Sequence, residues 1–154
     1  MIELRRILTA TDFSKHSMNA LRYAAAFAKA FNAEVIVVHV LEKADFLSNL
    51  PPVADGYLPP DLPEVQEKHA RVLCEQELAE VGLSQARVLL PHGNPYAEIV
   101  QVAKDEQADL IIVGTQGRGM LAHLLLGSVA ERVVRASPCP VLTVRSGEHE
   151  FVTP

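Results

Sequence analysis

Tryptophan is absent from this 154-residue sequence, and cysteine occurs only twice. Cys74 and Cys139 are far apart and form no Cys-x-x-Cys pair, so the sequence supports neither a disulfide framework nor a zinc site. We expect both thiols to be small buried apolar groups, the usual state of free cysteine. The six histidines are scattered without a metal-ligand spacing, and we predict no metal site built from them.

Long apolar runs and blocks of positive charge are also lacking. No window reaches the roughly 18 apolar residues that a membrane-spanning helix needs, and the first residues do not resemble a secretory signal. The formal net charge is −5 at pH 7, without a cluster of Lys or Arg, which argues against an electrostatic grip on nucleic-acid phosphates. We therefore expect a cytoplasmic protein with no membrane or nucleic-acid partner.

Apolar runs and helical patterns alternate along the chain. The runs that predict strands are 5–12, 33–40, 86–93, 108–115 and 139–145, and the patterns that predict helices are 14–31, 63–82, 94–107 and 128–137. Residues 35–38 and 110–113 are continuously apolar, which is typical of strands buried on both faces of a parallel sheet. The alternation predicts a single α/β doubly wound, Rossmann-like domain with a five-stranded parallel sheet and helices on both faces.

Capping signals set the expected helix ends. Ser14 is a natural N-cap, Asn94 is followed by Pro95 at a first helical position, and Gly82 follows the second helix. The residues expected to face the core are Ala20, Leu21, Ala24 and Phe27 in the first helix, and Val65, Leu73 and Leu78 in the second.

One segment, 42–63, carries five prolines and interrupts the alternation. We predict a long loop there, either a functional lid or an insertion without a role. The expected organisation is one domain over residues 1–146 that includes this loop, followed by a tail over 147–154.

Residues 114–128 hold four of the eight glycines, namely Gly114, Gly117, Gly119 and Gly127. The segment follows the fourth strand at its carboxyl end, where open α/β sheets bind ligands. Glycine allows unusual backbone angles and a close approach by a ligand, and exposed N–H groups in such a loop bind anions. The first half of the segment is therefore a candidate phosphate loop.

The second half opens a helix at Gly127 and Ser128. The first N–H groups of a helix lack internal partners and carry the positive end of its dipole, which favours phosphate. We expect the leucine-rich stretch between to return Gly127 toward Gly114. The alternatives are that Ser128 and Glu131 form a capping box that needs no ligand, and that Gly114 merely ends a strand. Two anion-competent ends on one loop favour a phosphate site.

The glycine pattern belongs to neither common phosphate motif. A Walker A loop is excluded because Gly119 is followed by Met120 and Leu121 instead of Lys and Ser or Thr. The dinucleotide fingerprint fails because this stretch reads G-x-x-G-x-G and follows the fourth strand.

The spacing of Gly114, Gly117, Gly127 and Ser128 resembles the G-x2-G-x9-G-[S/T] signature of the ATP-binding branch of the universal stress protein family. Residues 5–24, 35–40 and 128–145 resemble the first strand and helix, the second strand and the end of that family. The resemblance implies a sheet of order 3-2-1-4-5 and a bound ATP, ADP or AMP with Mg²⁺.

Site residues follow from the same resemblance. The resemblance implies that Asp12 and the backbone near Ala10 lie beside the adenosine. It also implies that the Val40 main chain forms a hydrogen bond with adenine. The residues implied to contact the phosphates and ribose are Gly114, Thr115, Gly117, Arg118, Gly119 and Met120. The residues implied to contact the phosphate chain from the other side are Gly127, Ser128 and Val129.

Some alternatives remain for these residues. Family members often read G-S-H-G-R, whereas here Thr115 keeps the hydroxyl and Gln116 replaces the histidine. Asp12 is also suited to a local turn before Ser14 or to a nucleotide-bound magnesium ion, and Arg118 to a solvated surface position.

No general base is evident in the glycine segment, so we expect binding with slow hydrolysis or none. The predicted function is an ATP-binding stress-response regulator or sensor and not an enzyme. The alternatives are a slow ATPase or autokinase and a nucleotide-independent interaction module. The last strand, 139–145, is an apolar sheet edge, for which the family resemblance implies a homodimer; the alternative is that tail 147–154 covers it.

Overall fold

The computed structural model describes residues 1–42, 60–116 and 126–145, in which strands and helices alternate. The strands are β1 (Arg6–Ala10), β2 (Glu34–Val38), β3 (Arg87–Leu89), β4 (Leu110–Gly114) and β5 (Val141–Val144). The helices are α1 (Lys15–Phe31), α3 (Leu62–Glu80), α4 (Pro95–Asp105) and α5 (Ser128–Ala136). Every predicted element is present near its predicted position, and α3 begins within the last two residues of the predicted loop 42–63.

The strands form one parallel sheet of order β3-β2-β1-β4-β5, as predicted. In the register of this sheet, Leu8 lies opposite Ile36 on one side and Ile111 on the other. The chain builds outward from β1 to β3 and then returns past β1 to add β4. The strand order therefore reverses between β1 and β4, which is where a doubly wound sheet opens a crevice at its carboxyl ends.

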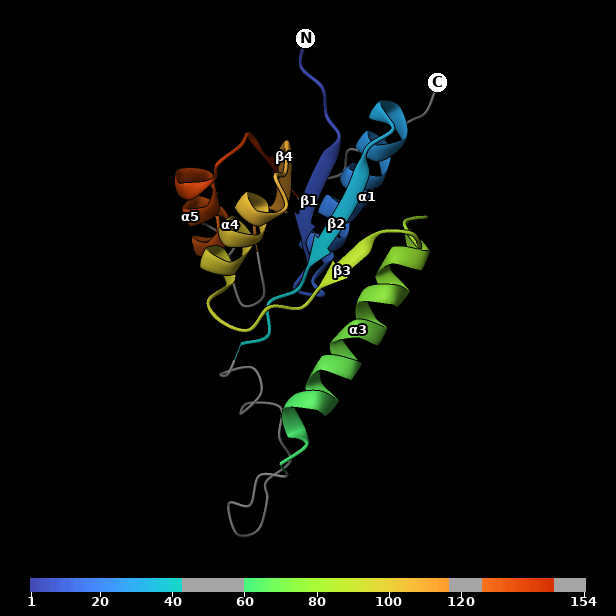
Figure 1. Cartoon of the computed structure of the whole chain (residues 1–154), viewed down its shortest axis with the longest axis vertical. Coiled ribbons are helices and arrows are strands. Elements are labelled where there is room, and N and C mark those ends of the chain that lie inside the picture. The colour runs from blue at the N-terminus through green and yellow to red at the C-terminus, as the bar shows by residue number, and fades with distance from the viewer. Residues whose placement is uncertain (43–59, 117–125, 146–154) are drawn as a thin grey trace.

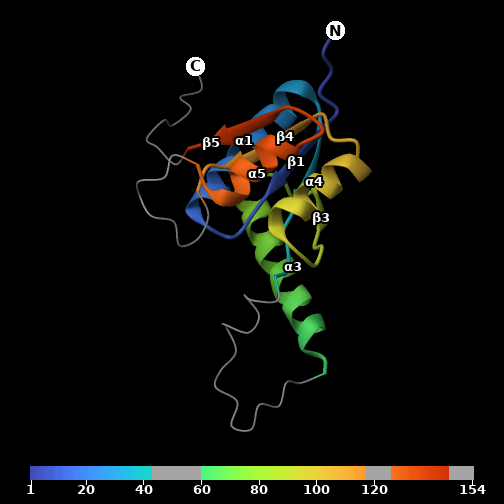
Figure 2. The same cartoon turned by 90° about the vertical axis from the view of Figure 1, so that its left-hand side faces the viewer.

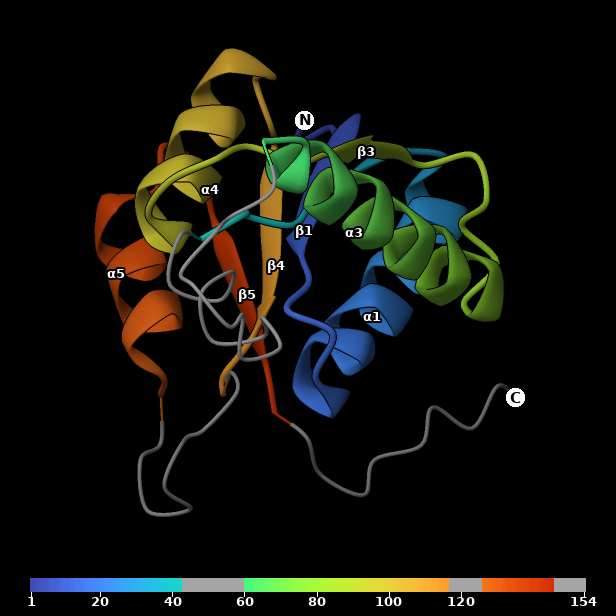
Figure 3. The same cartoon turned by 90° about the horizontal axis from the view of Figure 1, so that it is seen from below.

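Helices cover both faces of the sheet, with α1 and α3 on one side and α4 and α5 on the other (Figure 1, Figure 3). Because successive side chains of a strand point to opposite faces, neighbours such as Ile7 and Leu8 enter different cores. The buried residues on the α1 side are Ile7, Ala20, Leu21, Ala24, Val35, Val37, Leu78, Leu110, Ile112 and Val144. Those on the α4 and α5 side are Leu8, Val38, Val40, Ile99, Ala103, Ala108, Ile111, Val113, Ala130 and Val133.

The predicted helix ends are largely confirmed. The Ser14 side chain accepts the Ser17 N–H at 3.2 Å and caps α1. Asn94 is the N-cap residue of α4 and Pro95 its first residue, although the Asn94 side chain makes no capping hydrogen bond. Gly82, just beyond α3, has a φ of +76°, the left-handed conformation that favours glycine at a helix end.

Two predictions about buried residues are wrong. Val65 was expected to face the core but is 53% exposed, because the amino-terminal half of α3 extends past the end of the sheet (Figure 1, Figure 2). Cys139 is only half-buried because it lies in the turn that leads into β5, whereas Cys74 is fully buried as predicted. Phe27 is half-buried, packed against the α1-side core.

Residues 43–59, 117–125 and 146–154 lie outside the described ranges. Most of the predicted loop 42–63, the middle of the glycine segment and the tail 147–154 fall there, and the division into domain and tail stays a prediction. Of the helices in the described ranges, none combines the length and the apolar character that crossing a membrane requires.

Candidate functional site

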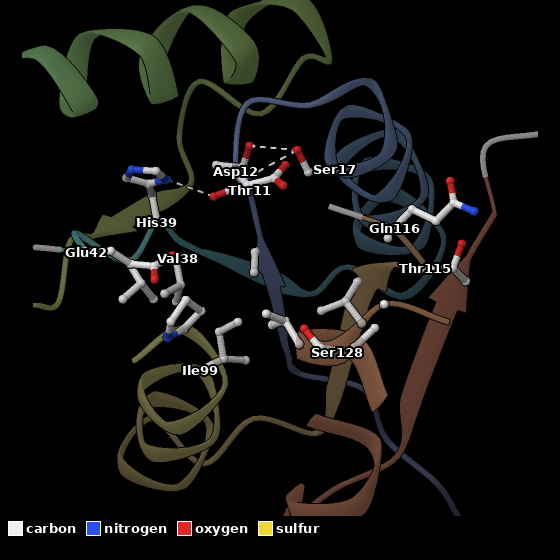
Figure 4. Close-up of a pocket in the computed structure, with 18 residues that line it drawn as sticks. Thr11, Asp12, Ser17, Val38, His39, Glu42, Ile99, Thr115, Gln116 and Ser128 are labelled. Atoms are coloured by element: carbon white, nitrogen blue, oxygen red, sulfur yellow. Dashed lines mark hydrogen bonds between the residues drawn. The ribbon is translucent and has the colours of Figure 1, made fainter. Parts of the chain in front are cut away.

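A cavity of about 290 Å³ lies at the carboxyl ends of β1, β2 and β4, beside the point where the strand order reverses (Figure 4). Its size and position suit a small-molecule ligand. All the predicted site residues in the described ranges line it: Ala10, Asp12, Val40, Gly114, Thr115, Gly127, Ser128 and Val129. The other four, Gly117, Arg118, Gly119 and Met120, lie outside the described residues.

The main chain of Val40 faces this cavity. The last bond between β1 and β2 runs from the Thr11 N–H to the Val38 carbonyl at 2.9 Å, and on the opposite side the Leu41 N–H donates to the Pro91 carbonyl at 2.8 Å. Alternate residues of an extended segment direct their N–H and C=O groups to opposite sides. Those of Val40 therefore point into the space beyond the end of β1.

Within the described ranges, the Val40 main chain makes no hydrogen bond. Only 8% of the residue is exposed. Buried backbone N–H and C=O groups are almost always paired, so this donor and acceptor are a candidate place for a ligand.

Apolar side chains from β2, β4 and α4 form one wall of the cavity. Val38, Val113 and Ile99 are buried and Pro95 lies beside them. Such a wall suits a flat ring better than a charged group. The sequence prediction missed these residues, although Val38 and Val113 stand at strand ends and Pro95 begins a helix, which are positions that face the carboxyl edge.

Gly114 has a packing role at the end of β4. A Cβ atom added to it would lie 2.8 Å from the His16 carbonyl oxygen and 3.3 Å from the His16 Cβ. Its φ is not positive; among the described glycines only Gly82 and Gly93 have positive φ. The missing side chain thus allows β4 to approach the beginning of α1, and the expectation that unusual backbone angles explain this glycine is wrong.

The two ends of the glycine segment meet, as expected. The Gly127 N–H donates to the Thr115 carbonyl, and the Thr115 N–H donates to the Val144 carbonyl at 2.9 Å. Both residues are therefore tied to the end of β5. This places the start of α5 beside the end of β4, at the mouth of the cavity (Figure 4).

The alternative considered for Ser128 and Glu131, a capping box, is wrong. Helix α5 begins one residue earlier than that motif requires, because the Glu131 N–H donates to the Gly127 carbonyl at 2.9 Å and makes Gly127 the N-cap. Gly127 has no side chain to cap the helix. The first turn of α5 therefore presents its N–H groups and positive dipole end to the cavity, through Ser128 and Val129.

Asp12 fulfils its turn role and also lines the cavity. Its Oδ1 accepts the Ser14 N–H at 3.0 Å, which confirms the local turn before α1. The residue lies with Thr11 and Ser17 on the polar side of the cavity (Figure 4).

His39 is a cavity residue that the sequence prediction missed. Its Nδ1 lies 2.9 Å from the Thr11 carbonyl oxygen, so Nδ1 carries the proton in this contact. Its ring packs on Phe13 with centroids 4.3 Å apart. The remaining lining residues that were missed are Thr11, Ser17, Glu42, Gln116 and Ala130. A possible signal was that His39 directly follows an apolar strand, but a single histidine is a weak one.

The arrangement joins an apolar wall, an unpaired main-chain edge and a helix amino terminus in one cavity. The described residues include no group of three His, Cys, Asp or Glu side chains placed to hold a metal ion. The site can therefore hold a molecule with a flat ring at one end and an anionic group at the other.

Comparison with known proteins gives one consistent family. Residues 3–145 match the universal stress protein family. A universal stress protein of Thermus aquaticus is 37% identical over 144 residues, which cover 92% of this chain and 98% of that protein. The solved structure of protein MJ0577 of Methanocaldococcus jannaschii is similar with a TM-score of 0.75 and 31% identity, covering 96% of this chain and 100% of that one. A universal stress protein solved in complex with cAMP is similar with a TM-score of 0.63 and 26% identity, covering 94% and 99%. This chain belongs to the universal stress protein family.

Proposed function

We propose that this protein binds an adenine nucleotide, which is ATP, ADP or AMP, in the cavity at the carboxyl edge of the sheet. The observation that carries the proposal is the main-chain edge of the buried residue Val40, which forms no hydrogen bond within the described ranges and lies beside an apolar wall. An adenine ring has flat apolar faces and an edge with an amino donor and a ring-nitrogen acceptor. Val38 and Ile99 suit the faces, and the Val40 C=O and N–H suit that edge.

The phosphate groups would lie at the start of α5. Gly127, Ser128 and Val129 offer main-chain N–H groups and a hydroxyl there, with Thr115 beside them. The predicted contributions of Gly117, Arg118, Gly119 and Met120 complete this part of the proposal. Asp12 is the candidate for a magnesium ion that accompanies the phosphates. The cAMP complex of a related protein supports an adenine nucleotide as the ligand.

The nucleotide acts as a regulatory ligand, and we expect hydrolysis to be very slow or absent. Phosphoryl transfer needs an attacking group positioned by a base, together with charge neutralisation. The Asp12 Oδ1 already accepts the Ser14 N–H, which ties this carboxylate to the turn. Phosphate release above the background of a Gly127→Val variant would favour the alternative, a slow ATPase or autokinase.

The regulator acts as a cytoplasmic homodimer formed by the last strand. Strand β5 is an outer strand of the sheet, and Val141, Leu142 and Thr143 are only half-buried. An apolar edge of this kind favours pairing with the same strand, residues 139–145, of a second copy. The dimer and the nucleotide together would form the stress-responsive unit.

The experiment measures the melting temperature with ATP, ADP, AMP and cAMP, and uses mass spectrometry to identify any ligand that survives purification. Each nucleotide that binds should raise the melting temperature as its concentration increases. No shift with any of them would contradict the proposal. Equal capture of a protein partner by the wild type and a Gly127→Val variant would instead favour a nucleotide-independent interaction module.

A matched pair of variants isolates the main-chain edge. Val40→Pro deletes the Val40 N–H, which forms no hydrogen bond in the described ranges, whereas Val40→Ala keeps it and shortens the side chain. We expect Val40→Pro to weaken ATP binding about tenfold. Val40→Ala should weaken it less, and equal effects would contradict the role given to the main chain.

A further inference from the structure

Glu77, a carboxylate on α3, does not line the cavity itself but forms a hydrogen bond with a residue that lines the polar side of the cavity. The Thr11 hydroxyl donates to Glu77 Oε2 at 2.6 Å, between residues 66 positions apart in the sequence. Thr11 lines the cavity, whereas Glu77 lines a separate hollow between α1 and α3. Glu77 therefore influences a ligand in the cavity through Thr11 and not by contact.

Glu77 lies on the inward side of its helix. The buried residues of α3 are Ala70, Cys74 and Leu78, and Glu77 is one helical turn from Cys74. Burial raises the pKa of the Cys74 thiol to about 12, and the negative charge of Glu77 adds to the effect. A carboxylate on an inward helix face needs a hydrogen-bond donor, and Thr11 supplies it.

Thr11 connects this carboxylate to the turn between β1 and α1. A carboxylate only accepts, so the single hydroxyl proton of Thr11 goes to Glu77. The Thr11 oxygen then accepts the Phe13 N–H at 3.1 Å. Ser17 Oγ lies 3.1 Å from the Thr11 oxygen, and the Ser17 hydroxyl donates to the Ser14 carbonyl at 3.0 Å. Ser17 Oγ in turn accepts the Asp12 N–H at 3.3 Å. The charge of Glu77 thus sets the direction of the Thr11 hydroxyl.

The turn needs such support because its backbone is strained. Phe13 has a φ of +63°, which a residue with a large side chain rarely adopts. The hydrogen bond from its N–H to Thr11 Oγ1 and the packing of its ring on His39 oppose that strain. Asp12, the predicted nucleotide contact, is the residue immediately before it.

We propose that Glu77 is a positioning residue of the nucleotide site, which fixes the turn carrying Asp12 and so couples the docking of α3 to nucleotide affinity. This inference rests on the proposed nucleotide binding. It assigns to α3 a role in ligand binding although the helix lends no side chain to the cavity among the residues described.

The experiment compares three variants of the full chain. Glu77→Leu removes the acceptor, Glu77→Gln keeps an acceptor oxygen, and Glu80→Leu is the matched control. Glu80 lies on the same helix and pairs with Arg22 at 3.3 Å, but makes no contact with Thr11. The two readouts are the ATP dissociation constant from calorimetry and the hydrogen-exchange rate of the Phe13 amide without nucleotide.

Glu77→Leu should weaken ATP binding about tenfold and speed Phe13 exchange by a similar factor. Glu77→Gln should restore most of both, and Glu80→Leu should change neither. The inference is overturned if Glu77→Leu binds ATP as the wild type does, or if Glu80→Leu weakens it equally. If the wild type binds no nucleotide, the proposed function and the coupling to affinity both fail, and unchanged Phe13 exchange in Glu77→Leu would show that Glu77 does not hold the turn either.

Discussion

The sheet has an amino edge, where its strands begin, and a carboxyl edge, where they end. Both edges are polar, but they differ in how their polar groups are paired. At the amino edge, Asp109 Oδ2 accepts the N–H groups of Arg5 and Arg6 at 2.8 and 2.9 Å. There, too, Arg87 donates to both carboxylate oxygens of Glu106 at 2.9 and 3.0 Å. At the carboxyl edge, the Val40 main chain has no hydrogen bond in the described ranges and α5 starts without a side-chain cap.

This difference separates a structural edge from the proposed binding edge. Charged residues gather at the amino edge, yet they satisfy one another and leave little for a ligand. The carboxyl edge has fewer charges but keeps donors and an acceptor for a molecule from outside. Missing partners therefore locate the site better than the density of charge does.

The largest effect is expected from Gly114→Ala at the carboxyl edge. The new Cβ would lie 2.8 Å from a backbone oxygen of His16, so β4 and α1 must move apart. We expect the free energy of unfolding to fall by about 2 to 3 kcal/mol, as for overpacked cores, and nucleotide binding to weaken with it. Urea denaturation measures the first and calorimetry the second.

Gly82→Ala, in the turn before β3, is its control. No atom lies within 4 Å of its added Cβ, but φ is +76°. The cost should be about 1 kcal/mol from backbone conformation alone, with nucleotide affinity unchanged. A Gly114→Ala protein as stable as the wild type would contradict the packing role.

Ser128→Asp tests the helix terminus at the carboxyl edge. The new carboxylate would lie in the first turn of α5, where it interacts favourably with the dipole but repels a bound phosphate. We expect unfolding stability to stay equal or rise slightly, while ATP affinity falls about tenfold. Thermal melts with and without ATP measure both, and adenosine should bind the variant nearly as well as the wild type. Equal losses for ATP and adenosine would place the phosphates elsewhere.

Asp109→Asn breaks the amino edge instead. Asn keeps an acceptor oxygen for the two N–H groups but removes the charge that strengthens both bonds. Unfolding stability should fall by about 1 kcal/mol, and ATP affinity should not change. A loss of ATP affinity would show that the two edges are coupled, contrary to the comparison above.

The smallest effect is expected from Arg87→Gln. The Arg87 guanidinium lowers the pKa of Glu106 below its ordinary value of 4.5. A lowered folded-state pKa contributes stability above that value, which is lost as the pH falls through the lowered pKa. The variant should therefore be slightly less stable at pH 7, and its stability should approach that of the wild type in acid. Added salt should reduce the difference at pH 7, because Arg87 is exposed and Glu106 is only half-buried.

Much of the fold could be predicted because local patterns carry it. The continuous apolar runs at 35–38 and 110–113 became strands buried on both faces, and Ser14 and Pro95 began helices where their chemistry requires. Predictions failed where distance in space mattered. Val65 fits the helical pattern of α3 but lies beyond the end of the sheet, where it is 53% exposed.

The candidate site was only partly predictable for the same reason. Glycines and strand ends pointed to Gly114, Gly127 and Ser128, which do line one cavity. The reason for Gly114 was missed, because a clash with His16 across 98 positions leaves no local mark. His39 and Glu77 were missed because their roles depend on Thr11, which lies far from both in the sequence.

The sequence by itself determined the order of strands and helices, the parallel sheet and the edge at which a ligand would bind, since hydrophobic period and capping act over a few residues. Only the tertiary structure decided which groups are left unpaired there. The chain after β2 runs on past the end of β1, so the Val40 main chain has no partner there among the described residues, and Gly127 caps α5 without a side chain. Whether a buried polar group is paired depends on every residue that lies near it in the folded protein, including residues far away in the sequence. A local sequence pattern does not contain that information.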